Sequence, residues 1–85
     1  MHFALKTVEE LADAIRRRAI EIASGEGETI DPPRPGIQRL REPIGLGVHW
    51  TLSDYQNLRG LPYIRVAAAE ASAQWDLTPD HESDG

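Results

Sequence analysis

The residues with the most chemical promise in this sequence are two glycines, Gly45 and Gly47, in the alternating run Ile-Gly-Leu-Gly-Val-His-Trp at positions 44–50. A Gly-x-Gly pair is part of the loop that binds dinucleotide phosphates. The full fingerprint needs a third glycine where this chain has Trp50, and no Gly-Lys-Ser/Thr sequence follows. We therefore predict no nucleotide site. The alternation instead predicts a strand with a bare glycine face, against which a helix or a partner packs closely.

The histidines and serines do not combine into a catalytic or metal site. His2, His49 and His81 are scattered along the chain, whereas a metal ion needs three or four ligands that converge. The chain has no cysteine, which excludes thiol chemistry, disulfides and thiolate zinc sites. His49 is the one candidate for acid–base chemistry, and a partly exposed sheet position is the favoured interpretation. The sequence predicts no catalytic residue, no metal ion, no cofactor and no enzymatic activity.

Three arginines, Arg34, Arg39 and Arg41, form the candidate nucleic-acid contact. If residues 37–41 and 44–50 make a hairpin, Arg39 and Arg41 point to the same side and can contact a phosphate backbone. The alternative is a solvated strand face whose arginines pair with nearby acids. A net charge of −5 opposes nonspecific binding to DNA, so we favour the solvated face and expect no direct nucleic-acid binding.

The segment 62–75 predicts a helix that is apolar nearly all round. Ile64 and Ala67 belong to one face, and Val66, Ala69 and Ala73 belong to the opposite face. Such a helix is usually buried on more than one side, which a domain of this size can hardly provide. We therefore expect one face to meet another protein, with a homodimer as one possibility. Tyrosine and arginine are enriched at interface hot spots. The predicted partner-binding residues are Tyr55, Arg59, Tyr63, Val66, Ala69 and Ala73.

The remaining patterns predict a small single α+β domain over residues 1–76. A Thr7–Glu10 capping box begins a helix over 8–24, and a Pro/Gly-rich loop follows at 25–36. A short two- or three-stranded antiparallel sheet (2–6, 37–41 and 44–50) packs with three helices (8–24, 52–59 and 62–75). Residues 77–85 are acidic and predicted to be a disordered tail.

Charge is unevenly distributed along the 85 residues: residues 1–31 carry −3, residues 32–65 carry +3 and residues 66–85 carry −5. No apolar run is long enough to span a membrane, and the first residues lack the basic and apolar pattern of a signal peptide. We therefore expect a cytoplasmic protein without membrane contact, in the host cytoplasm if a phage encodes it.

Two functional classes remain once an enzyme is set aside. The favoured one is a small acidic protein-binding module, an inhibitor or adaptor from a phage or mobile element. Eight Arg, one Lys and ten Ala are typical of GC-rich coding and suggest that source. An anti-defence or anti-CRISPR-like protein of this kind would cover the basic surface of a nucleic-acid-binding complex through charge complementarity. The alternative is a small DNA-binding regulator, excisionase-like or antitoxin-like, that uses the arginines of 34–41.

Overall fold

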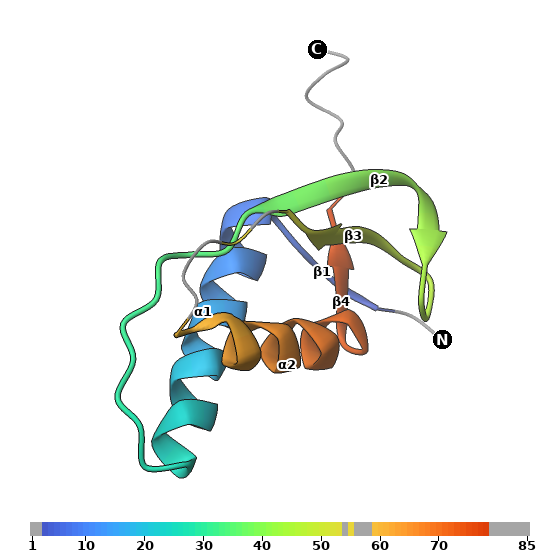
Figure 1. Cartoon of the computed structure of the whole chain (residues 1–85). Helices are drawn as coiled ribbons and strands as arrows, with labels where there is room; N and C mark the ends of the chain where they lie inside the picture. Colours follow the sequence, from blue (N-terminus) through green and yellow to red (C-terminus); the bar gives the residue numbers. More distant parts are fainter. Residues whose placement is uncertain (1–2, 54, 56–58, 79–85) are drawn as a thin grey trace.

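The chain combines short strands with two helices, in the order β1 (Ala4–Lys6), α1 (Val8–Gly25), β2 (Ile37–Ile44), β3 (Val48–Leu52), α2 (Leu61–Ser72) and β4 (Trp75–Leu77) (Figure 1). The computed structural model describes residues 3–53, 55 and 59–78. Within these residues the α+β class is confirmed, but there are two helices where the sequence predicts three. No helix of the described residues is long and apolar enough to cross a membrane.

Helix α1 forms as predicted, because its start and its buried face are both encoded locally. The Glu10 amide donates to the Thr7 hydroxyl at 3.1 Å, and the Thr7 amide donates to the Glu10 carboxylate at 3.0 Å. This capping box satisfies two amides that the first helical turn leaves unpaired. The apolar residues then recur at helical spacing and are buried. They are Leu11, Ala12, Ile15, Ala19 and Ala23.

The strands form two separate pairs instead of one antiparallel sheet. β2 and β3 make an antiparallel hairpin, with Arg39 opposite Trp50 and Ile44 opposite Val48. β1 pairs in parallel with β4, so that Lys6 lies opposite Leu77. The predicted strand 2–6 is therefore present over Ala4–Lys6, but its antiparallel place in a common sheet is wrong. Residue 2 lies outside the described residues.

The predicted strand over 44–50 is wrong in its first half. Ile44 ends β2, the next three residues form the hairpin turn, and β3 begins at Val48. The Gly47 amide closes the turn by donating to the Ile44 carbonyl at 2.9 Å. Gly45 and Gly47 have φ angles of +58° and +112°, which side chains disfavour. These glycines allow the chain to reverse and do not form a bare sheet face.

The helix predicted over 52–59 is not present in the described part of that segment. Leu52 ends β3, Ser53 and Tyr55 have no regular structure, and Arg59 lies in a turn. Residues 54 and 56–58 lie outside the described residues. The sequence Thr-Leu-Ser-Asp at 51–54 indicates a helix start. The apolar Leu52 instead continues β3, because it pairs with Ile37 of β2 and packs against the core.

Helix α2 begins one residue earlier and ends sooner than the predicted 62–75. The chain turns after Ser72, with the Gln74 amide donating to the Ala71 carbonyl at 3.0 Å. Trp75 then begins β4, and pairing with β1 buries Leu77. The Thr78 amide donates to the Lys6 carbonyl at 2.9 Å, so the folded part extends beyond residue 76. Positions 79–85 of the predicted tail lie outside the described residues.

The core lies where the two helices and the strands meet. Figure 1 shows α2 crossing α1, with the strand pairs on one side of both helices. Residues 26–36 connect α1 to β2 without helix or strand, as the proline and glycine content predicts, and Pro32 and Pro35 are buried. The fully or nearly fully buried apolar residues include Leu11, Ile15, Val48, Trp50, Ile64, Ala67, Ala71 and Leu77.

Candidate partner-binding surface

The two sides of α2 have different environments. Ile64, Ala67 and Ala71 are buried in the core. On the other side, Ala69 and Ala73 are exposed and the Val66 side chain is 48% exposed. At 3.6 residues per turn these three exposed residues follow one strip along the helix. The predicted outer apolar face of this helix is therefore present, and its role in binding stays a prediction.

A groove of about 280 Å³ runs beside this strip, between α2 and the β2–β3 hairpin. Val48, Trp50 and Leu52 line it from β3, and Ile44 lines it at the hairpin end. From α2 it is lined by Arg65, Ala68, Ala69 and Ser72. The small alanine and serine side chains of α2 leave the groove open. Arg65 is the one charged residue among the described residues that line it.

The hairpin tip adds apolar surface next to the groove. Leu46, between the two turn glycines, is 71% exposed, and Ile44 is 47% exposed. Neither residue is among the predicted partner-binding residues, because the alternation at 44–50 places both on the packed face of a strand. The available signal was the glycine on each side of Leu46, which is typical of a tight turn.

Tyr55, Arg59 and Tyr63, also predicted to bind a partner, do not lie on the outer strip of α2. The Tyr63 hydroxyl donates to the Glu28 carboxylate, and the Tyr55 hydroxyl donates to the Pro33 carbonyl at 3.3 Å. The hydrogen bond to Glu28 raises the pKa of Tyr63, and burial raises the pKa of Tyr55. Arg59 is exposed next to a hollow formed with residues 29–32. These three residues lie against the loop that follows α1.

The three arginines of the candidate nucleic-acid contact are not a uniform group of free cations. Arg34 forms an ion pair with Asp13 at 3.2 Å, and Arg39 donates to the Thr78 carbonyl at 2.8 Å. Arg41 is exposed, and no contact within the described residues engages its guanidinium. A register shift between Arg39 and Ile44 also interrupts the regular alternation that would point Arg39 and Arg41 to the same side.

His49 and Asp76 form the most ordered polar contact near the strands. One Asp76 oxygen accepts from the His49 and Leu77 amides, at 2.7 and 2.8 Å, and the other lies 2.8 Å from His49 Nδ1. Burial alone would raise the pKa of Asp76. The hydrogen bonds from His49 and Leu77 outweigh burial and hold the pKa of Asp76 below its ordinary value. No sequence signal joins these residues, because they are 27 positions apart.

The hydrogen bonds of the His49–Asp76 pair lie between β3 and β4, beside a hollow with mostly apolar lining. The adjacent hollow is lined by Leu5, Arg39, Leu40 and Leu77, and no serine or threonine of the described residues contributes to it. An aspartate can orient a histidine as a base, but nucleophilic catalysis also needs a nucleophile within reach. The pair instead connects β3 to β4, together with the Trp50 indole, which donates to the Trp75 carbonyl at 3.1 Å.

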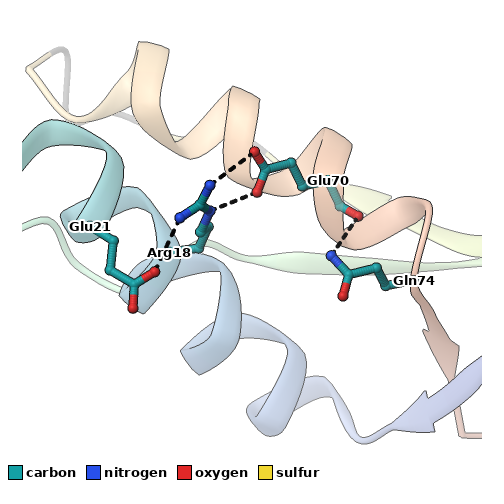
Figure 2. A network of polar contacts seen from close by, with 4 residues as sticks. All are labelled: Arg18, Glu21, Glu70 and Gln74. Atoms are coloured by element: carbon teal, nitrogen blue, oxygen red, sulfur yellow. Dashed lines mark hydrogen bonds and ion pairs between the residues drawn. The ribbon is translucent and has the colours of Figure 1, made fainter. Parts of the chain in front are cut away.

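Arg18 connects the two helices on another side of the molecule (Figure 2). Its guanidinium donates to both Glu70 oxygens, at 2.7 and 3.4 Å, and to Glu21 at 3.2 Å. These hydrogen bonds lower the pKa of Glu70 and raise the pKa of Arg18. Lys6 Nζ lies 4.8 Å from the centre of the Trp75 ring, and both residues line, together with Arg18 and Glu70, a hollow separate from the groove beside the hairpin. The Arg18 charge is thus balanced internally.

Two further observations concern metal binding and similarity to known proteins. Within the described residues, no three His, Cys, Asp or Glu side chains are close enough to hold a metal ion. Comparison with known protein families, curated proteins and solved structures finds no match to this chain. The surface formed by α2 and the hairpin is therefore the strongest indication of what the chain does.

Proposed function

We propose that the chain is a small protein-binding module that docks through the α2–hairpin surface. We define this surface as the groove between the two elements, the hairpin residues Ile44 and Leu46, and the outer strip Val66, Ala69 and Ala73. The observation that carries the proposal is that exposed apolar side chains from two separate elements border one groove. Contiguous exposed apolar surface with a polar rim is typical of protein interaction sites.

The surface is held in place before any partner binds. Val48 and Trp50 hold the hairpin against the core, and Ile64 and Ala71 do the same for α2. Both sides of the groove therefore belong to elements with a buried face. A preformed surface loses little conformational entropy on association, which favours binding.

The finer proposal, an inhibitor or adaptor that covers a basic surface, depends on acids outside this site. The described residues include nine Lys and Arg against ten Asp and Glu, so the folded part is nearly neutral. The other four acids, Asp54, Asp80, Glu82 and Asp84, lie outside the described residues. We propose that they attract a basic partner and that the apolar groove makes the contact. We do not propose direct DNA binding, because Arg34 and Arg39 are engaged within the chain.

The test is partner affinity in matched surface variants. A partner captured with the intact chain from its native cells is purified, and its Kd is measured against wild type, Ala69→Glu and Arg17→Glu. Ala69→Glu places a charge beside the groove and is expected to weaken binding at least about tenfold. Arg17, an exposed residue of α1 with no ion pair among the described residues, is the control. Equal losses in both variants would contradict the proposed surface.

A further inference from the structure

We propose that the α2–hairpin surface also binds a second copy of this chain, with Leu46 of each copy inserted into the groove of the other. This inference rests on the proposed function, because it uses the same surface and names one occupant of it. Two observations support a second copy as the occupant: the position of the exposed Leu46 next to the groove residues Ile44 and Gly45, and the unpaired, opposite charges of Arg65 and Glu42.

The shape of the surface is self-complementary. Leu46 projects from the hairpin tip, and the groove begins beside it at Ile44 and Gly45. An exposed side chain next to the end of a groove can enter the groove of a second copy, and a two-fold axis makes this contact reciprocal. The groove already has apolar walls formed by Val48 and Trp50, so a leucine side chain is a chemically suitable occupant.

Two unpaired charges near the groove have opposite signs and can pair between two copies. Arg65 lines the groove, and no ion pair within the described residues neutralises it. Glu42 is exposed on β2, two residues before Ile44, and the contacts of the described residues leave it equally unpaired. When Leu46 of a second copy enters the groove, its Glu42 approaches Arg65. The two-fold axis repeats the contact, so that a dimer contains two such ion pairs.

The extent of the patch predicts a weak association. It consists of one hairpin tip, one groove and one helix strip, which places it with the small interfaces below about 1,200 Å². We therefore expect a monomer–dimer equilibrium with a Kd on the order of micromolar. Such an equilibrium leaves the surface available to another protein, which would compete with the second copy.

Charge reversal in separate chains tests the arrangement. In Arg65→Glu the two contacts become Glu–Glu, and in Glu42→Arg they become Arg–Arg, so each variant alone is expected to dimerise at least about tenfold more weakly than wild type. An equimolar mixture of the two variants restores both contacts in a mixed dimer. Sedimentation velocity from about 1 µM to about 1 mM should show a mixed dimer with a Kd near that of wild type, and a Kd at least about tenfold higher for each variant alone.

Two further variants locate the contact. Leu46→Asp is expected to weaken the dimer at least about tenfold, since it places a charge in the apolar groove. Arg17→Glu, on the far helix α1, should leave the Kd unchanged. A wild type that stays monomeric to 1 mM, or a dimer that survives Leu46→Asp and both charge reversals, would overturn the inference. Neither result affects the proposed function, which is decided by the affinity of Ala69→Glu for a purified partner.

Discussion

The two strand pairs of this molecule are held together in different ways. β2 and β3 are neighbours in the sequence, joined by a three-residue turn and by a backbone ladder. β1 and β4 come from opposite ends of the described chain and pair over three residues each. Side chains join β4 to β3: Asp76 accepts from the His49 amide, and the Trp50 indole donates to the Trp75 carbonyl. The hairpin is held together by its own turn and ladder, which are local in the sequence. β4 is held in place by contacts with residues far from it in the sequence.

The surface proposed for binding is therefore separate from the contacts that join β4 to the rest of the fold. The hairpin tip carries Ile44 and Leu46 into solvent, and its turn is closed by its own backbone. Asp76 has both oxygens occupied by donors of this chain, and its side chain is only 13% exposed. We infer that changes at the tip affect association and that changes at Asp76 affect folding.

Asp76→Ala is expected to produce the largest effect on stability. It removes the acceptor of the His49 and Leu77 amides at the junction of β3 and β4. Leaving partly buried amides unpaired should lower the free energy of unfolding by about 3 kcal/mol. Urea unfolding of wild type and variant measures this loss. Asp76→Asn keeps an oxygen for both amides, so it should cost less than half as much. Equal losses in the two variants would contradict the role of the amides.

Gly47→Val is expected to have the next largest effect, because it acts on the turn of the hairpin. An added Cβ at Gly47 would meet only Phe3 Cε2, at an ordinary contact distance of 3.8 Å, so the cost comes from the backbone φ of +112°. Strain of this kind is about 1–3 kcal/mol. Gly47→Ala should lose nearly as much, which distinguishes strain from overpacking. Gly25→Ala is the control, since Gly25 has a φ outside the positive region and open space around it.

The contrast between α1 and the hairpin shows how far the sequence could predict this fold. The Thr7–Glu10 capping box and the 3.6-residue apolar spacing both lie within the α1 segment and both indicate a helix. The start and the buried face of α1 were therefore predictable. The alternation at 44–50 is also local, but glycine suits both a sheet position that lies close to another chain segment and a tight turn. The positive φ at Gly45 and Gly47 decides between them, and the sequence does not reveal it.

Contacts between residues far apart in the sequence explain the other differences between the predicted and the observed elements. The sequence predicts Trp75 as the last residue of an alanine-rich helix and Leu77 as the first residue of the tail, because three residues are too few to show a strand period. Only pairing with Ala4–Lys6 makes this segment a strand. The exposed strip of Val66, Ala69 and Ala73 was predictable from helical spacing. The groove beside it was not, because it requires the hairpin to lie next to α2.

The pH dependence of stability should identify Asp76 as the contact that joins β4 to β3. Its pKa is lower in the folded protein than the ordinary value of about 3.9. The folded state therefore binds the proton less readily than the unfolded state. Its stabilising contribution is complete above about pH 5 and is lost as the pH falls below about 4. In thermal unfolding measured from about pH 5 downward, Asp76→Asn should flatten this part of the profile. Glu70→Gln, at the exposed ion pair with Arg18, should flatten it much less.

Leu46→Asp is expected to have the smallest effect on stability, although it acts at the centre of the proposed interface. Leu46 is 71% exposed, has a φ outside the positive region and lies in a turn that tolerates aspartate. The unfolding free energy of the Leu46→Asp variant, measured in dilute, monomeric protein, should match that of wild type within about 0.5 kcal/mol. Val48→Asp, at the first residue of β3, is the contrast, because Val48 is buried and cannot accept an unpaired charge. If Leu46→Asp lost more than about 1 kcal/mol, Leu46 would pack against its own chain and would not be free to enter a groove on a second copy.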